Sequence, residues 1–231
     1  MKKIEKNDKR TTLEMYRDYC QAMDEGEVFA VSISEENSKM GRVPSVSLPA
    51  VISCPSRCKG TCGQAGACYA LKTEKLRPFV RASYARNLAI LHKRPTQYWA
   101  EVEAACQRSR FFRFHVSGDI VNADYFTHMV EIATRCPWCQ VLAFTKNYEV
   151  VNAWMDQHGD LPENLHVLFS GWYDMIDVAS LNPHNLPTTE VYDETPAENW
   201  LLCGGCCETC GCRGLGCWQA KKGDTIAFKK H

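Results

Sequence analysis

The 231-residue sequence has no excess charge of either sign, with 27 basic and 27 acidic side chains. Proteins whose main task is to bind nucleic acid carry a basic surface, so this balance of charge argues against that class of protein. It does not exclude local basic patches. No stretch approaches the ~18 uncharged apolar residues that a membrane span requires. The start, MKKIEKNDKRTT, lacks the apolar region of a secretory signal. We therefore expect a cytoplasmic protein without a membrane partner.

Cysteine, by contrast, is abundant, with 14 residues. A chain of this length buries enough surface to fold without covalent staples, and thiols in a reducing compartment suggest metal binding before disulfides. Ten cysteines fall in two short stretches, residues 54–68 and 203–217, which we call the first window and the C-terminal window. Such a distribution needs a chemical reason.

Apolar strand patterns alternate with helical periodicity along the chain, at spacings of about 20 to 30 residues. This alternation predicts parallel strand pairing. We expect one domain over 1–231, an α/β fold with a single TIM-barrel-like, radical-SAM-like parallel barrel, whole or partial. Residues 1–27 would form an N-terminal helical extension, entered through a capping box of Thr11 and Glu14. The predicted helices are 13–23, 79–93, 95–106, 122–133 and 148–155. The apolar runs that we predict to be strands are 28–34, 47–53, 111–119, 140–147, 165–172, 200–203 and 224–228. We expect residues 173–199 to be irregular.

Reactive or polar residues follow these runs at their carboxyl ends. In a parallel barrel all such ends share one rim, where barrel enzymes place their chemistry. Any strand must end in something polar, so each residue alone is weak evidence, but two of the runs open cysteine windows. We therefore predict that both windows lie at this rim. The residues concerned are Cys54, His115 to Asp119, Thr145 to Asn147, Ser170, Trp172 and Cys203.

Successive cysteines of the first window are separated by three, three and five intervening residues, so the window contains no CxxC unit. Zinc sites favour CxxC knuckles. A loop rich in glycine and small residues lets backbone N–H groups approach sulfide, and Arg57 and Lys59 add positive potential for a dianionic cluster. The window therefore favours an iron–sulfur cluster of the [4Fe-4S] type over zinc. Its candidate ligands are Cys54, Cys58, Cys62 and Cys68.

The C-terminal window contains two adjacent CxxC units, so zinc is a serious alternative here. Against zinc, no histidine lies nearby and six thiols exceed one tetrahedral site. A second iron–sulfur cluster would use four thiols and leave two as spares or as ligands that reach across the rim. The candidate ligands are Cys203, Cys206, Cys207, Cys210, Cys212 and Cys217.

Candidate catalytic residues are His115, Asp119 and Lys146, which we expect to face a substrate space at the rim. The plainer alternatives are a core histidine and a solvated strand end. Cys136 and Cys139 form a CxxC unit of redox type. The unit lies between a predicted helix and the strand that follows, at the end of the barrel opposite the rim, so an incidental or local structural role is the better interpretation. For Cys20 and Cys106, on helix faces, we expect small buried hydrophobes.

Several short motifs, in this order, resemble the phage gene-product-88-like family. They are LPAVISCP leading to Cys68-Tyr69-Ala70, FRFHVSGDI, the FTK of 144–146, Cys217-Trp218 and IAFKKH, so the resemblance runs from about residue 47 to the C-terminus. It implies a radical-SAM-like barrel with a cysteine-bound iron–sulfur site in a phage or prophage setting, hence the cytoplasm of a bacterial host. The family's first motif has three cysteines. Cys54 and Cys68 carry over, while Cys58 and Cys62 compete for the middle position.

Radical SAM enzymes carry a CxxxCxxC loop after the first barrel strand and a glycine-glycine-acid turn that holds the amino group of S-adenosylmethionine. This chain has CxxxCxxxC and Ser117-Gly118-Asp119 at the corresponding places. The resemblance thus makes S-adenosylmethionine a candidate cofactor, with Ser117 and Gly118 as its binding turn. The departures from the pattern argue against it.

Three functions follow from these patterns. The first is an iron–sulfur protein with two clusters at the barrel mouth and a redox or radical-SAM-like activity toward a small molecule or redox partner. The second is a zinc-stapled binding module for nucleic acid or a host protein. The third is a non-catalytic electron carrier or sensor.

Overall fold

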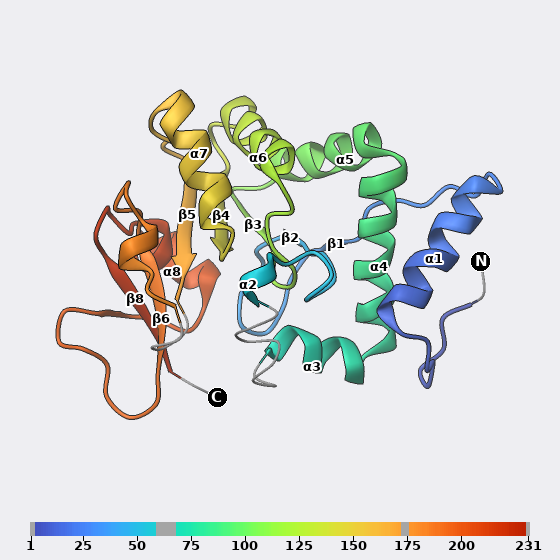
Figure 1. Cartoon of the computed structure of the whole chain (residues 1–231), viewed down its shortest axis with the longest axis horizontal. Coiled ribbons are helices and arrows are strands. Elements are labelled where there is room, and N and C mark those ends of the chain that lie inside the picture. The colour runs from blue at the N-terminus through green and yellow to red at the C-terminus, as the bar shows by residue number, and fades with distance from the viewer. Residues whose placement is uncertain (1–2, 59–67, 172–175, 230–231) are drawn as a thin grey trace.

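The computed structural model describes residues 3–58, 68–171 and 176–229 (Figure 1). Helices and strands alternate through most of the chain, as the sequence predicts. The helices are α1 (Thr12–Asp24), α2 (Ser56–Cys58), α3 (Tyr69–Leu76), α4 (Pro78–Lys93), α5 (Pro95–Gln107), α6 (Ala123–Arg135), α7 (Tyr148–His158) and α8 (Cys207–Arg213), with 3-10 turns η2 (Ala179–Leu181) and η3 (Gly216–Trp218). The strands are β1 (Ile33–Ser34), β2 (Ser45–Val46), β3 (Phe111–Phe114), β4 (Gln140–Thr145), β5 (Leu165–Ser170), β6 (Thr188–Tyr192), β7 (Leu201–Leu202) and β8 (Thr225–Lys229).

These strands form one sheet in the order β1-β2-β3-β4-β5-β6-β8-β7. Only β1 runs antiparallel to its neighbour, and the other six pairings are parallel. The described sheet is not closed, since β1 and β7 stand at its ends. A mostly parallel α/β fold is therefore confirmed, and closure into a barrel stays a prediction. All the parallel strands end at one margin of the sheet, which we call the carboxyl edge.

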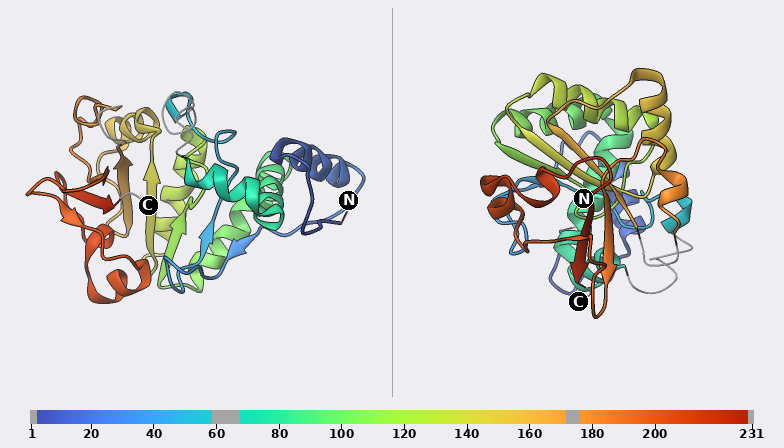
Figure 2. Two further views of the ribbon diagram at one scale, coloured as in Figure 1. Left: turned by 90° about the horizontal axis from the view of Figure 1, so that it is seen from below. Right: turned by 90° about the vertical axis from the view of Figure 1, so that its left-hand side faces the viewer.

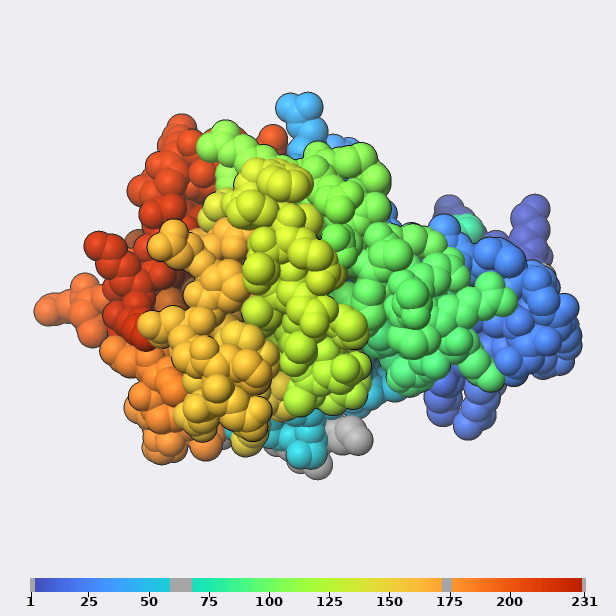
Figure 3. Space-filling view, turned by 90° about the horizontal axis from the view of Figure 1, so that it is seen from above, coloured from blue at the N-terminus to red at the C-terminus, as the bar shows by residue number. Residues whose placement is uncertain are grey.

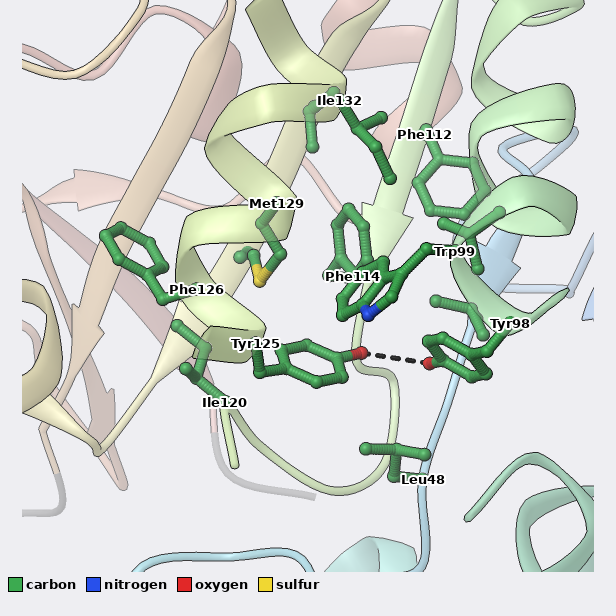
Figure 4. Packing of buried hydrophobic residues seen from close by; sticks show 14 of the residues in the cluster. Leu48, Tyr98, Trp99, Phe112, Phe114, Ile120, Tyr125, Phe126, Met129 and Ile132 are labelled. Carbon is green, nitrogen blue, oxygen red and sulfur yellow. Dashed lines mark hydrogen bonds between the residues drawn. The ribbon is translucent and has the colours of Figure 1, made fainter. Parts of the chain in front are cut away.

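Helices α4 to α7 pack with β3, β4 and β5 in one hydrophobic core, on the face of the sheet that we call the helical face. In Figure 3 the residues of this stretch, coloured green to gold, form one continuous surface. Strand residues alternate in direction, so Phe112 and Phe114 of β3 point toward these helices. They meet Tyr98 and Trp99 of α5 and Tyr125 of α6 in an aromatic core, where the Tyr98 and Tyr125 hydroxyls are hydrogen-bonded at 2.9 Å (Figure 4). The core fixes the position of β3 and of the turn that follows it.

The opposite face, which we call the cysteine face, carries Phe111, Leu142 and Leu168, and Trp218 of η3 packs on it. Half-buried Cys207, Cys210 and Cys217 pack around the same cluster. The C-terminal segment therefore covers this face, where no helix of the α4 to α7 layer lies.

Several local signals are confirmed. Thr11 and Glu14 form the predicted capping box at α1, and Asn122 caps α6. Pro78 and Pro95 stand in the first turns of α4 and α5, where a missing backbone N–H costs nothing. Within the described residues, no helix has the length and apolar character to cross a membrane.

Three predictions of local structure are corrected. Residues 47–53 are not a strand, because β2 ends at Val46 and the chain then turns, with Val51 in the left-handed region at φ 67°. Of 28–34, only the two residues of β1 pair with a neighbour. Residues 173–199 contain the five-residue strand β6, whose β-branched TTEVY run between prolines is a signal that could have found it.

Candidate functional site

The first window lies at the carboxyl edge, beyond β2. Cys54 Sγ accepts a hydrogen bond from the Val51 N–H at 3.3 Å, and Cys68 caps α3 by accepting from the Leu71 N–H at 3.4 Å. Cys58 is buried at the end of α2, with 4% of its surface exposed. The fourth candidate ligand, Cys62, lies outside the described residues. The backbone N–H groups that donate to Cys54 and Cys68 fit the predicted thiolate loop, and three of its four cysteines lie in the described residues.

Arg57, also in this window, contacts the start of α7. Its guanidinium carbon lies 4.6 Å from the centre of the Tyr148 ring, and it forms an ion pair with Glu149. Burial raises the pKa of Tyr148, and the positive charge of Arg57 opposes that shift. Arg57 thus fastens the window to α7 instead of pointing freely at a ligand.

Glu74 of α3 connects the first window to the rest of the carboxyl edge, and sequence reasoning missed it. Its carboxylate is 1% exposed and accepts hydrogen bonds from the Ala50 N–H at 2.6 Å, the Ser117 hydroxyl at 3.0 Å and the Thr12 hydroxyl at 2.9 Å. Burial raises the pKa of Glu74, and the three hydrogen bonds and the charge of Arg81 oppose the shift. A buried acid of this kind has no sequence signal beyond its place on a short helix.

His115 does not face an open substrate space. It has φ 64°, and this left-handed conformation turns the ring into the aromatic core, 5.4 Å from the Tyr125 ring centre. The side chain is 3% exposed, and neither ring nitrogen has a partner in hydrogen-bond geometry, although the Ser117 carbonyl lies near enough to favour protonation slightly. Burial, together with the charge of Arg113, lowers the pKa of His115 to about 3, so the ring is neutral.

Ser117 and Gly118, the predicted cofactor-binding turn, make contacts that hold the fold together. The Ser117 hydroxyl donates to Glu74. Gly118 has φ 82°, and a Cβ there would lie 2.8 Å from the Leu48 carbonyl oxygen. The glycine is required because the turn lies directly against the chain after β2.

Asp119 and Lys146 tie the carboxyl ends of three strands together. Buried Asp119 accepts hydrogen bonds from the Thr145 hydroxyl at 2.5 Å, the Ile120 N–H at 2.7 Å and the Lys146 N–H at 2.9 Å. Burial raises the pKa of Asp119, and these bonds oppose the rise. Lys146 Nζ donates to Ser170 Oγ at 2.6 Å. The three predicted catalytic residues are therefore neighbours along one edge but are used in packing and hydrogen bonding there.

The C-terminal window begins at the end of β7, where the Cys203 N–H donates to the Ala227 carbonyl of β8 at 2.9 Å. The chain then turns back through Gly204 and Gly205, the latter at φ 85°, and α8 lies on the cysteine face. Trp218 anchors it: its indole N–H donates to the Cys207 carbonyl at 2.9 Å, and its ring centre lies 5.0 Å from that of Phe111.

Four of the six thiols in this window lie close enough to influence one another. Burial raises the pKa of Cys217 to about 12, and negative charge on Cys203, Cys207 or Cys210 would raise it further. Burial also raises the pKa of Cys207. Two glycines stand next to the sulfur of Cys210, since a Cβ at Gly204 would lie 2.8 Å from it and one at Gly216 would lie 3.6 Å away. Cys203, Cys207, Cys210 and Cys217 therefore form one group, which we call the thiol quartet.

The other two thiols of the window point elsewhere. A Cβ at Gly41 would lie 3.3 Å from Cys206 Sγ, and hydrogen bonds from the Thr209 side chain and backbone lower the pKa of Cys206. Cys212 is exposed and lines a cleft of about 370 Å³ together with Arg108 and Arg110. Neither residue belongs to the quartet.

Cys203 follows the end of β7 at the carboxyl edge, as expected, but α8 of the C-terminal window does not lie there with the described cysteines of the first window. The Glu208 N–H of α8 donates to the Met40 carbonyl at 2.9 Å, and Gly211 packs against Phe111 at the amino end of β3. Both views in Figure 2 show the dark-red C-terminal helical segment and the cyan α2 on opposite sides of the sheet. The physical cause is the two-residue length of β7 and the sharp glycine turn after it, which reverse the chain before it can extend beyond the carboxyl edge.

No disulfide bond joins two of the thirteen described cysteines. In the part of the chain that the structure describes, no three Cys, His, Asp or Glu side chains form a ready-made metal site. Cys136, Cys139 and Cys106 are fully buried in the core, and a hydrogen bond to Cys139 and burial raise the pKa of Cys106.

These features define an α/β protein with a mostly parallel open sheet, a thiol loop at its carboxyl edge and a thiol-rich segment on one face. The family model of Gene product 88 matches residues 26–204, so the chain belongs to the Gene product 88 family. The match spans the first window and ends one residue after Cys203, before α8. No significant match was found among curated proteins or among solved structures.

Proposed function

We propose that this chain is an iron–sulfur protein whose C-terminal window holds a cluster. The observation that carries the proposal is the thiol quartet on the cysteine face: half-buried Cys207, Cys210 and Cys217 pack on one cluster, and Cys210 Sγ lies against Gly204, the neighbour of Cys203. Four thiolates are the usual ligand set of a [4Fe-4S] cluster. When bound, such a cluster supplies one-electron redox chemistry.

The residues around the quartet fit such a group. Gly204 and Gly216 leave space around Cys210 Sγ that any side chain at those positions would fill. Trp218 and Phe111 shield one side from water, and Cys203 is exposed at the other, so the site would be reachable from solvent. Partial exposure of this kind suits electron exchange with a redox partner better than a sealed structural site.

We further propose that the first window holds a second cluster. Cys54, Cys58 and Cys68 follow β2 at the carboxyl edge, and backbone N–H groups donate to the sulfurs of Cys54 and Cys68. The run of parallel neighbours from β2 to β7 is consistent with a partial barrel as the parent architecture. Because His115, Ser117 and Asp119 are committed to the fold, we favour an electron carrier or sensor over an enzyme that uses S-adenosylmethionine. A titration of the reduced protein with S-adenosylmethionine distinguishes the two, since binding and cleavage would indicate the enzyme.

The full chain, purified without oxygen, should contain iron and acid-labile sulfide in equal amounts, absorb near 400 nm and give an EPR signal after reduction. Cys210→Ser and Cys212→Ser form a matched pair, since both residues lie on α8 but only Cys210 belongs to the quartet. We expect Cys210→Ser to lose the iron of the C-terminal window and Cys212→Ser to retain it. Equal iron in both variants would contradict the assignment.

Zinc is the second candidate, favoured by the two adjacent CxxC units of the C-terminal window. A colourless protein with stoichiometric zinc and no sulfide would replace the iron–sulfur proposal with a zinc-stapled binding module. A protein with neither metal would contradict both.

A further inference from the structure

Arg113 is the one residue of β3 that presents a charge to the cysteine face. Its guanidinium carbon lies 4.6 Å from the centre of the Phe144 ring, and Nη1 lies 3.4 Å from Met40 Sδ and 3.9 Å from Cys207 Sγ. The partners of this cation are thus an aromatic ring and two sulfur atoms. None of them carries a negative charge while the thiol is protonated.

No carboxylate compensates Arg113 among residues 3–58, 68–171 and 176–229, and its buried Nε has no hydrogen-bond partner. The charge of Arg113 acts on both sides of the sheet. It opposes the rise that burial causes in the pKa of Cys207 and Cys217 on the cysteine face, and it adds to the lowering that burial causes in the pKa of His115 in the aromatic core. A half-buried guanidinium without an anion is costly, since burial removes much of its hydration. Because Arg113 lies beside the quartet, the anion that would balance its charge is the thiolate form of these cysteines.

We propose that Arg113 is the counter-charge of the metal centre in the C-terminal window. Four thiolates around a divalent ion or a [4Fe-4S] core carry a net negative charge, and the guanidinium beside Cys207 stabilises that charged form relative to the empty, protonated window. Arg113 is therefore a positioning residue that sets metal affinity without being a ligand. This inference rests on the proposed function, and it holds for either metal because both are bound by thiolates.

The test uses the full chain, stripped of metal and kept reduced, and titrated with Co²⁺ as the probe. Cobalt–thiolate absorption that disappears in Cys210→Ser reports the C-terminal window alone. Arg113→Met keeps the length of the side chain and its contact with Phe144 but removes the charge, whereas Arg113→Lys keeps the charge. Arg110→Met is the matched control, because Arg110 also lies over an aromatic ring, that of Phe111, at 5.2 Å, but lines the cleft beside Cys212, a thiol outside the quartet.

We expect Arg113→Met to weaken cobalt binding at this window by roughly tenfold or more, since a charge contact near 4 Å in a partly buried site is strong. Arg113→Lys should recover most of the affinity, and Arg110→Met should match the wild type. Circular dichroism of the metal-free variants establishes that they are folded. Equal affinity in Arg113→Met and wild type, or a loss that Arg113→Lys does not recover, would overturn the inference. Wild-type protein without any cobalt signal sensitive to Cys210→Ser would instead overturn the proposed function of the window.

Discussion

Glu74 offers the most direct test of how the carboxyl edge is held together. Its Oε1 accepts from the Ala50 N–H and the Ser117 hydroxyl, and its Oε2 accepts from the Thr12 hydroxyl. One carboxylate thus joins α1, the turn that leads into the first window, and the turn after β3. Glu74→Ala removes all three acceptors from a site that is 1% exposed.

Leaving a buried donor without an acceptor costs about 1 to 3 kcal/mol. The Ala50 N–H cannot move, while the two hydroxyls can rotate toward other acceptors, so we expect Glu74→Ala to lower the free energy of unfolding by about 3 to 5 kcal/mol. Glu74→Gln keeps Oε1 for Ala50 and Ser117, and its amide can donate to the Thr12 hydroxyl instead of accepting from it. The cost at neutral pH should therefore stay within about 1 kcal/mol.

The difference in stability between the wild type and Glu74→Gln should also depend on pH. Because burial raises the pKa of Glu74 above the ordinary 4.5, folding favours its protonated form. The stability that protonation contributes is fully present below pH 4.5 and is lost as pH rises through the folded-state pKa. Glu74→Gln has no such term, so the stability of the wild type relative to Glu74→Gln should fall as pH rises from 4.5.

Urea unfolding of the full chain, followed by circular dichroism at several pH values, measures these differences. Glu163→Gln is the control, since Glu163 is exposed in the loop before β5 and should give less than 0.5 kcal/mol at every pH. If Glu74→Ala cost less than about 1 kcal/mol, or if Glu74→Gln followed the wild type in parallel across pH, the reasoning about the buried carboxylate would be refuted.

Two further predictions concern the turn after β3. Burial holds the pKa of His115 at about 3, so the wild type should lose up to about 4 kcal/mol of stability as pH falls from 6.5 toward 3. The variant His115→Asn should lose less, because asparagine tolerates the left-handed conformation but does not titrate. Thermal melts at stepped pH measure the difference, and parallel curves would contradict the prediction. Gly118→Ala should destabilise the fold by at least about 2 kcal/mol more than Gly159→Ala. Both glycines have positive φ, but of the two only Gly118 would place a Cβ against backbone, at the Leu48 carbonyl oxygen. Equal unfolding midpoints of the two variants would argue against this close approach.

Local sequence signals predicted most helices and the parallel sheet. The capping box at Thr11 and the proline at position 95 mark helix starts because each supplies a specific backbone requirement within one turn of chain. The apolar runs of β3, β4 and β5 are buried on both faces, and their hydrophobic length identified them.

Positions that depend on long-range pairing could not be predicted in this way. Strand alternation places residue 115 on the face opposite Phe114, but the positive φ of His115 turns its ring into the helical core instead. Likewise, nothing local indicates that β8 inserts between β6 and β7, or that the chain reverses after Cys203. The cysteine windows were recognised as thiol clusters, but their separation on the sheet and the partnership of Arg113 with the quartet required the three-dimensional arrangement.

The central claim is that the gathered thiols hold an iron–sulfur cluster. The measurement that tests it most directly is the content of iron, acid-labile sulfide and zinc per chain in the full-length protein prepared without oxygen. We predict iron and sulfide in equal amounts, at about four of each per cluster, with little zinc. Stoichiometric zinc without sulfide, or no bound metal of any kind, would contradict the account.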